Sequence, residues 1–236
     1  MSRNHAQKNI ETLAFVANRL EELCDEVVFV GGCVTGLLVT DKASPDVRFT
    51  VDVDCIVNVV TKSSYYNLSE KLRQKGFKEI PFGDHPICRW NCEGIFVDIM
   101  PIDENVLGFS NRWYKDALEN SLIKKINDSI QIKFISAPYF LATKFEAFKD
   151  RGEQDFLSSH DLEDIVFIID ARAEIVEDVS NALENVKEYL SSELYSLVSN
   201  DLFLQALPGH LNYSEEYKIR QDMVLNRMQM MIDQSQ

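Results

Sequence analysis

Near residue 136 the chain passes from a mixture of two apolar periodicities to helical spacing alone. This transition limits the possible folds more than any other feature of the sequence. Before that point, segments with an apolar residue at every second position alternate with segments of helical spacing. From Ala137 onward only helical spacing occurs. We therefore predict an α+β fold with two domains, in which residues 1–136 form a mixed sheet flanked by helices and residues 137–236 form a helical bundle.

Local patterns place the elements of both domains. VVFV (27–30) is a continuous apolar run, which is typical of a strand buried on both faces. The other expected elements of the first domain are a helix over 6–24, a short helix after Gly31-Gly32, a strand within 47–60, a helix over 64–76, strands near 77–82, 86–92 and 94–100, and a hairpin of 120–126 with 129–135 across Asn127-Asp128. In the helical domain we expect breaks near Gly152, Asn200 and Pro208-Gly209.

The net charge is −14, from 24 Lys and Arg against 38 Asp and Glu, and it is unevenly distributed. Residues 152–236 carry −12, whereas residues 105–151 carry +3 and residues 1–104 carry −5. General affinity for a phosphate backbone needs an excess of Lys and Arg, so this charge argues against a protein that coats DNA. It still leaves room for one local phosphate site.

Hydropathy and cysteine usage indicate the compartment. No apolar run approaches the ~20 residues needed to cross a bilayer, and the amino-terminal MSRNHAQKNIETLAF contains no apolar signal core. The five cysteines are odd in number and lack the regular spacing of a disulfide framework, which suits a reducing compartment. We therefore expect a cytoplasmic protein with no membrane partner.

Three carboxylates are the first candidate site. In VDVDCIVNVV, side chains alternate across the sheet, so Asp52 and Asp54 project from the same face. A second apolar strand, GIFVDIM, carries Asp98 in its middle. If the two strands are neighbours, the three acids cluster, and Mg²⁺ or Mn²⁺ would remove the cost of that repulsion. The simpler alternative for Asp52 and Asp54 is the solvated face of a strand.

Residues around the acids suggest a phosphate site. Gly31 and Gly32 end a buried strand and open a helix, where backbone N–H groups can hold a phosphate, although tight turns also use paired glycines. Arg48 and Thr50 lie just ahead of the acids, where a guanidinium could contact a phosphate. The combination favours a nucleotide site more than any one of these residues does.

Charged residues also occur on apolar helix faces in the second domain. Lys144 falls within the apolar sector of 137–151, and Arg151 points nearly the same way two turns later. We expect Lys144 to reach toward the phosphates of a nucleotide, with Arg151 as a second candidate contact. A structural ion pair of Arg151 with Asp161 or Asp164 is the interpretation that we favour for those three residues.

Together these motifs resemble a known superfamily. VFVGGCVTGLL, VRFTVDVDCIV and FVDIM resemble the active-site signature of nucleotidyltransferases of the DNA polymerase β superfamily. With Lys144, Arg151 and Asp161, the chain looks most like the AbiEii-type abortive-infection nucleotidyltransferase toxins over residues 27–170, except that His160 stands where Lys or Arg is more usual. The resemblance implies a nucleotidyltransferase-type sheet, with the first helices of the second domain contributing to the nucleotide site.

The resemblance also implies roles for individual residues. Gly31 and Gly32 would contact the triphosphate of an NTP, Lys144 would contact the nucleotide, and Asp52, Asp54 and Asp98 would bind Mg²⁺ and form the catalytic group. The implied reaction moves an NMP from an NTP, such as ATP, to an acceptor hydroxyl on an RNA end such as tRNA, a protein or a small molecule.

The expected biological setting is a toxin–antitoxin or abortive-infection system with an antitoxin protein as partner. Two alternatives remain open: a catalytically silent module that binds nucleotide or a partner, and an antibiotic nucleotidyltransferase whose acidic surface attracts a cationic drug.

Overall fold

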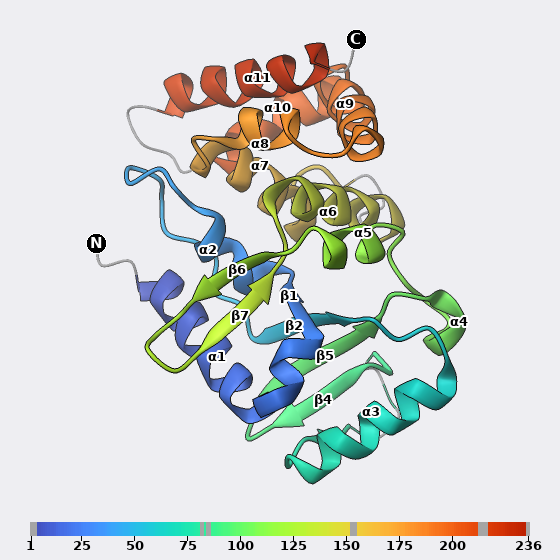
Figure 1. Cartoon of the computed structure of the whole chain (residues 1–236). Helices are drawn as coiled ribbons and strands as arrows, with labels where there is room; N and C mark the ends of the chain where they lie inside the picture. The colour runs from blue at the N-terminus through green and yellow to red at the C-terminus, as the bar shows by residue number, and fades with distance from the viewer. Residues whose placement is uncertain (1–3, 81–82, 84–85, 152–154, 212–216, 235–236) are drawn as a thin grey trace. The chain divides into compact units, whose positions relative to one another are not determined.

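The computed structural model describes residues 4–80, 83, 86–151, 155–211 and 217–234 (Figure 1). The chain forms two compact units. Unit 1 contains residues 1–37 and 46–136, and unit 2 contains residues 38–45 and 137–236. Unit 2 thus includes a short excursion from the amino-terminal half, which the hydropathy pattern does not single out.

Unit 1 is built on one mixed sheet. Its seven described strands lie in the order β3-β4-β5-β2-β1-β7-β6. Their bounds are β1 Val27–Val30, β2 Asp52–Val57, β3 Lys78–Glu79, β4 Arg89–Cys92, β5 Ile95–Pro101, β6 Leu122–Lys125 and β7 Gln131–Phe134. β2 runs parallel to β5, β1 runs parallel to β7, and the other neighbours are antiparallel. The predicted α+β class, with a mixed sheet, flanking helices and a carboxyl-terminal helical region, is confirmed.

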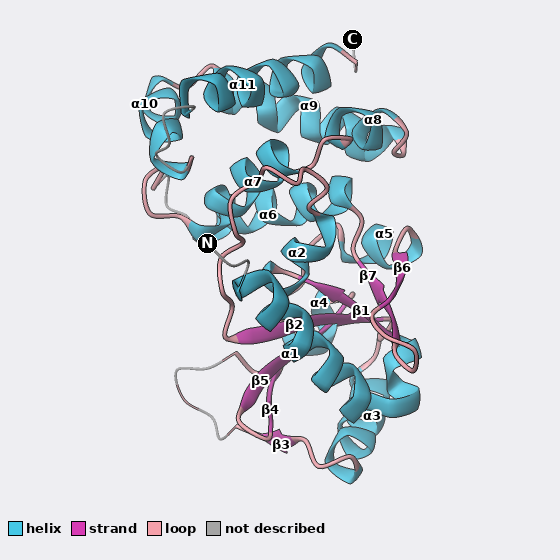
Figure 2. Ribbon diagram, turned by 90° about the vertical axis from the view of Figure 1, so that its left-hand side faces the viewer, coloured by secondary structure: helices cyan, strands magenta, loops and turns pink. Residues whose placement is uncertain are grey.

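Helices flank this sheet, as Figure 2 shows for α1 and α3. The helical elements of unit 1 are α1 Asn4–Leu20, the 3₁₀ helices η1 Glu21–Glu26 and η2 Gly32–Val34, α2 Thr35–Leu38, α3 Lys62–Gln74, α4 Glu104–Leu107 and α5 Tyr114–Glu119. Leu13 and Val16 of α1 and Leu68 and Leu72 of α3 are buried. All four residues of β1 are buried as well, as its continuous apolar run predicts.

The elements predicted for this unit are present with adjusted bounds. The hairpin of β6 with β7 is confirmed, and β1 has the expected bounds. β2 is shorter than the alternating segment 47–60, because residues 46–50 are not in a strand and are tied instead to α1. There the Asn9 side chain donates a hydrogen bond to the Arg48 carbonyl and accepts one from the Thr50 N–H.

Unit 2 is helical. Its helices are α6 Ala137–Arg151, α7 His160–Ala171, α8 Ile175–Ser180, α9 Glu184–Val198, α10 Asp201–His210 and α11 Tyr217–Asp233. The segment 38–45 joins this unit through the backbone N–H groups of Thr40 and Asp41, which donate to the Ala171 carbonyl at the end of α7. Leu38 contributes its carbonyl to Arg172.

The helix breaks predicted for unit 2 have different outcomes. The break at Asn200 is confirmed, since the Asn200 side chain caps the start of α10. The break near Pro208-Gly209 is also confirmed, since α10 ends at His210, although Pro208 itself lies inside the helix. Proline lacks an N–H and its ring crowds the preceding turn, so a helix seldom continues far beyond it. The break near Gly152 lies outside the described residues.

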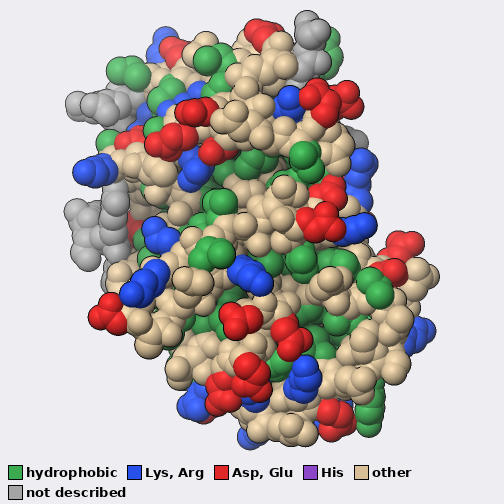
Figure 3. Space-filling model, in the orientation of Figure 1, with side chains coloured by type: hydrophobic (Ala, Val, Ile, Leu, Met, Phe, Trp, Pro, Cys, Tyr) green, Lys and Arg blue, Asp and Glu red, His purple; other side chains and the backbone are tan. Residues whose placement is uncertain are grey.

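Acidic and basic side chains are interspersed over the face that Figure 3 draws. Among the described residues, none of the helices combines the length and the hydropathy that a membrane span requires.

Candidate metal centre

The acidic site is built by two neighbouring strands. β2 and β5 pair in parallel, with Asp54 opposite Asp98 and Asp52 opposite Phe96. Because residues opposite each other in a sheet point to the same face, Asp54 and Asp98 project together, and Asp52 follows them two residues away. Each of the three residues offers a carboxylate oxygen, and these oxygens all lie within 4.8 Å of one another. The condition that the sequence left open, the pairing of these two strands, is therefore met.

Gly31 closes one side of this site. It follows β1 with φ 69° and ψ −165°, a backbone conformation open essentially to glycine alone. A Cβ placed on Gly31 would lie 1.9 Å from Oδ2 of Asp54, so the chain can pass this close to the carboxylate only without a side chain. The first glycine is therefore required by the packing of the site itself. Gly32, by contrast, begins the three-residue helix η2.

Arg89 enters the same cluster and was missed by sequence reasoning. It lies on β4, directly opposite Asp98. Its Nε is 2.8 Å from Asp98 Oδ1 and its Nη2 is 2.7 Å from Asp98 Oδ2, a bidentate pair. The same Nη2 is 2.9 Å from Asp52 Oδ2. The hydrogen bond with Asp98 is the main cause that raises the pKa of Arg89. One signal was available: Arg89 is a cation within the predicted strand 86–92, between Cys88 and Trp90.

The thiols near the acids are not competing ligands. Burial raises the pKa of Cys33, and the neighbouring Asp54 charge raises it further. Burial likewise raises the pKa of Cys55, which lies between Asp54 and Ile56 on β2. Both thiols therefore stay protonated at neutral pH, and a protonated thiol does not bind a metal ion. The donor set of this site is made of carboxylate oxygens.

Two of the predicted phosphate contacts, Arg48 and Thr50, precede β2. Thr50 is buried, and its backbone N–H donates to the Asn9 side chain at 3.3 Å. The Arg48 carbonyl accepts from the same Asn9 side chain at 3.0 Å. These bonds fix the backbone ahead of the acids to α1, so the segment is positioned independently of the strand pairing. A phosphate contact by either side chain stays a prediction.

Lys144 and Arg151 meet at one carboxylate in unit 2. Lys144 Nζ lies 3.0 Å from Asp161 Oδ1 and 2.6 Å from Asp164 Oδ2, and Arg151 Nε lies 2.8 Å from Asp161 Oδ2. The favoured ion pair of Arg151 with Asp161 is thus confirmed. The ammonium of Lys144, expected to reach for a nucleotide, is held by two carboxylates of its own unit. A nucleotide contact by Lys144 or Arg151 remains a prediction.

Electrostatics explain why this buried network is stable. Burial alone lowers the pKa of Lys144, but the charges of Asp164 and Asp161 outweigh it and hold the pKa above its ordinary value. Burial alone raises the pKa of Asp161, but Arg151 and Lys144 bring it below its ordinary value. Lys144 and Asp161 are therefore both charged at neutral pH, and each offsets the charge of the other.

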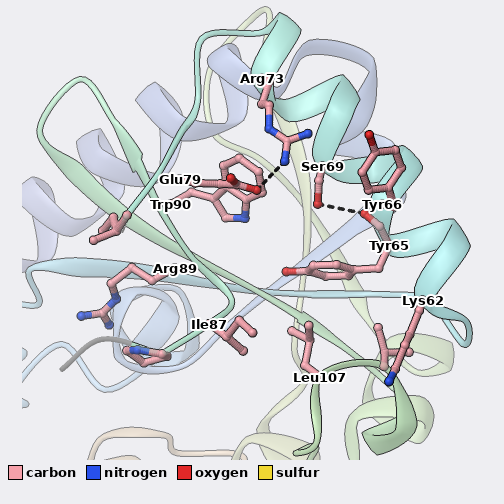
Figure 4. Close-up of a pocket in the computed structure, with 13 residues that line it drawn as sticks. Lys62, Tyr65, Tyr66, Ser69, Arg73, Glu79, Ile87, Arg89, Trp90 and Leu107 are labelled. Carbon is pink, nitrogen blue, oxygen red and sulfur yellow. Dashed lines mark hydrogen bonds and ion pairs between the residues drawn. The ribbon is translucent and has the colours of Figure 1, made fainter. Parts of the chain in front are cut away.

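A cavity of about 650 Å³ adjoins β4 in unit 1. Tyr65, Ile87, Trp90 and Leu107 are among its lining residues, and this volume is in the range of small-molecule sites. Figure 4 shows the Arg89 guanidinium pointing away from Tyr65 and Trp90. Successive strand residues face opposite sides, so Trp90 faces α3, where Arg73 lies 5.9 Å from its ring, while Arg89 faces the acids. Arg89 is nevertheless also among the residues that line the cavity, so its side chain borders both the cavity and the acidic cluster.

The chemistry open to the acidic cluster follows from its donors. Three carboxylates from adjacent strands suit a hard divalent cation such as Mg²⁺ or Mn²⁺. Without a cation, the Arg89 guanidinium supplies positive charge to two of the three acids. No protein-family model matches the chain, and no curated protein matches it in sequence.

Proposed function

We propose that this chain is a nucleotidyltransferase that depends on a divalent cation and moves an NMP from an NTP to an acceptor hydroxyl. The observation that carries the proposal is the convergence of Asp52, Asp54 and Asp98, with carboxylate oxygens within 4.8 Å of one another on two parallel strands. The glycine turn against Asp54 supports it, since it brings backbone close to the acids. The resemblance of these motifs to the DNA polymerase β superfamily supplies the reaction class.

The three carboxylates fit the expected cation. They are oxygen donors on two paired strands, β2 and β5, and the two neighbouring thiols are buried and protonated. Asp52, Asp54 and Asp98 would hold Mg²⁺ or Mn²⁺. When bound, the cation would offset the negative charge that develops on the phosphoryl oxygens.

The reaction forms one bond and breaks one. The acceptor oxygen bonds to the α-phosphorus of the NTP, the bond from that phosphorus to the bridging oxygen of the β-phosphate breaks, and pyrophosphate leaves. The acceptor hydroxyl loses its proton, which Asp98 accepts as general base in this proposal. Asp52 and Asp54 position the reacting groups, and positioning with electrostatic stabilisation accounts for most of such catalysis.

The direct test uses each NTP labelled at the α-phosphate, with Mg²⁺ and a cell extract. We expect the wild type to label a component of the extract, and Asp52→Asn/Asp54→Asn to label none. Asp128→Asn is the matched control, because Asp128 is an exposed carboxylate in the turn of the β6–β7 hairpin. The labelled component identifies the acceptor as an RNA end, a protein or a small molecule. Equal labelling by the wild type and the double variant contradicts the proposal.

One observation favours a second candidate, a catalytically silent module that binds nucleotide or a partner. Arg89 already provides charge-assisted hydrogen bonds to Asp98 and Asp52, so the cluster is stable without a cation. Calorimetry with each NTP discriminates the two. Tight binding without release of pyrophosphate supports the silent module, whereas turnover that requires Mg²⁺ supports the enzyme.

The resemblance to abortive-infection toxins extends the proposal to cells. We expect induced expression of the wild type to arrest bacterial growth, and the Asp52→Asn/Asp54→Asn variant at equal abundance not to. Growth arrest by the wild type and the double variant alike would show that the toxicity is independent of nucleotidyl transfer. An antitoxin partner would then be sought among proteins that relieve the arrest.

A further inference from the structure

Arg89 occupies the acidic cluster in the way that a cation would. Its guanidinium makes three hydrogen bonds of 2.7–2.9 Å to Asp98 and Asp52. Asp98 uses both of its oxygens for this contact, and its side chain is only 8% exposed. Arg89 thus engages both oxygens of Asp98 and one oxygen of Asp52, three of the oxygens that a divalent cation could use.

Arg89 and a divalent cation would compete for these carboxylates. The bidentate guanidinium takes one lone-pair site on each Asp98 oxygen, which leaves fewer sites for a metal ion, and two positive centres a few ångströms apart repel each other. We propose that Arg89 is the internal counter-ion of this site, and that a divalent cation binds by displacing it from Asp98 and Asp52. This inference rests on the proposed metal-dependent function and concerns the regulation of the same site.

The surroundings of Arg89 are consistent with such an exchange. Its side chain is 17% exposed, so the guanidinium lies near solvent. It also lies 5.3 Å from the centre of the Phe96 ring, which helps to hold it over the acids. Displacement gives up these contacts, so Arg89 lowers the affinity of the site for a cation. In return, it protects the fold from unpaired acids whenever no cation is bound.

The first experiment measures Mn²⁺ affinity by calorimetry and by the paramagnetic signal of free Mn²⁺. We expect Arg89→Gln to bind Mn²⁺ at least about tenfold more tightly than the wild type, because the competing charge is gone. Arg89→Lys, which keeps the charge but loses the fork, should fall between the two. Arg73→Gln is the matched control: Arg73 also has two acidic partners and an aromatic neighbour, but those partners are Glu70 and Glu79 rather than the acids of the cluster.

A second measurement guards against a variant that merely folds poorly. In EDTA, Arg89→Gln should have a lower melting temperature than the wild type, since Asp98 and Asp52 lose their counter-charge. Saturating Mn²⁺ should raise its melting temperature by more than it raises that of the wild type or of Arg73→Gln. A purely structural role of Arg89 predicts equal increments from Mn²⁺ in all three proteins.

The outcomes separate this inference from the proposed function. If the wild type binds Mn²⁺, Asp54→Asn abolishes binding and Arg89→Gln binds no more tightly, then the exchange is overturned while the metal centre stands. If folded wild type and folded Arg89→Gln both fail to bind Mn²⁺, the metal centre and the exchange are overturned together. If Arg89→Gln binds Mn²⁺ more tightly than the wild type and Arg73→Gln does not, the result supports both the metal centre and the exchange.

Discussion

At the scale of single residues, the candidate metal centre of unit 1 depends on one position without a side chain, and the helical core of unit 2 depends on one buried charge. Gly31 is needed where the chain passes Asp54, and Lys144 holds two carboxylates together in unit 2. Neither role is visible in the residue type alone. Glycine pairs are common in turns, and a lysine in an apolar sector can serve either a ligand or a buried acid.

We predict that Gly31→Ala weakens both the fold and the metal site. Its Cβ would collide with Oδ2 of Asp54, in a backbone conformation whose strain costs about 1–3 kcal/mol for other residues. Gly94→Ala is the matched control, since Gly94 also has positive φ but no atom within 4 Å of the added Cβ. We expect the Gly31 variant to lose more unfolding free energy in urea than the control, and to bind Mn²⁺ about 10–100-fold more weakly. Equal losses in the two variants would refute the role of the close approach.

We predict that Lys144→Met destabilises the protein by about 3–5 kcal/mol, the usual cost of leaving buried charges without their partner. Lys149→Met, which removes a half-exposed lysine from Glu146 and Glu193, should cost less than about 1 kcal/mol. Urea unfolding at pH 7 measures both.

The stability lost in Lys144→Met should depend on pH in a definite direction. In the wild type the pKa of Asp161 is lowered, so its stabilising contribution is present above the ordinary carboxyl pKa and is lost as pH falls through the lowered value. Without the ammonium of Lys144, Asp161 becomes easier to protonate. The deficit of Lys144→Met relative to wild type should therefore shrink as pH falls through the ordinary carboxyl pKa toward the lowered pKa of Asp161. A deficit that grows over this range would contradict the assignment.

At the scale of elements, the segment ahead of β2 fixes the start of α1. The Asp46 carboxylate accepts hydrogen bonds from the backbone N–H groups of His5 at 3.0 Å and Ala6 at 3.2 Å. Free N–H groups at the first turn of a helix need such an acceptor. Asp46 therefore serves α1 as an N-terminal cap from a distant part of the sequence.

We predict that Asp46→Ala costs about 1 kcal/mol of unfolding free energy, as the loss of a helix cap does. Burial alone raises the pKa of Asp46, but the N–H donors of His5 and Ala6 bring it below its ordinary value. The stabilisation is thus present above the ordinary carboxyl pKa and is lost as pH falls through the lowered one. Asp128→Ala, at a fully exposed position, is the control and should change stability little at any pH. An effect of Asp46→Ala that persists at pH 2 would argue against the charged cap.

The positions of the strands and helices along the chain were largely predictable, whereas the pairing of the strands in the sheet was not. Strict alternation in VDVDCIV placed Asp52 and Asp54 on one face, and β2 has that alternation. The strand that contains Arg89 was also expected, but nothing in its own pattern says that Arg89 stands opposite Asp98. Strand partners are separated by tens of residues in some cases, so pairing depends on the whole core.

At the scale of the whole molecule, the net charge of −14 is the dominant property. Like charges repel over a distance of roughly 30 Å at 0.01 M salt but only about 8 Å at 0.15 M. Residues 152–236 alone carry a net charge of −12, so this repulsion is concentrated in unit 2. Self-repulsion of this kind destabilises the compact state.

We therefore predict that the melting temperature rises when NaCl is increased from 10 to about 150 mM, because screening reduces the repulsion. KCl at equal ionic strength should give the same shift, which separates screening from binding of a particular ion. Scanning calorimetry measures both series. A melting temperature that falls with salt would show that attractive ion pairs outweigh the net charge.

The sequence by itself determined which faces are apolar, where most strands and helices lie, and that Asp52 and Asp54 project together. These properties follow from the local period of side chains along a strand or helix. Only the tertiary structure decided that β2 lies parallel to β5, that Arg89 reaches Asp98 and Asp52, and that Lys144 is held by Asp161 and Asp164. Those contacts join residues on separate elements, and they form because the folded core brings the elements side by side and leaves buried charges no stable choice but to pair.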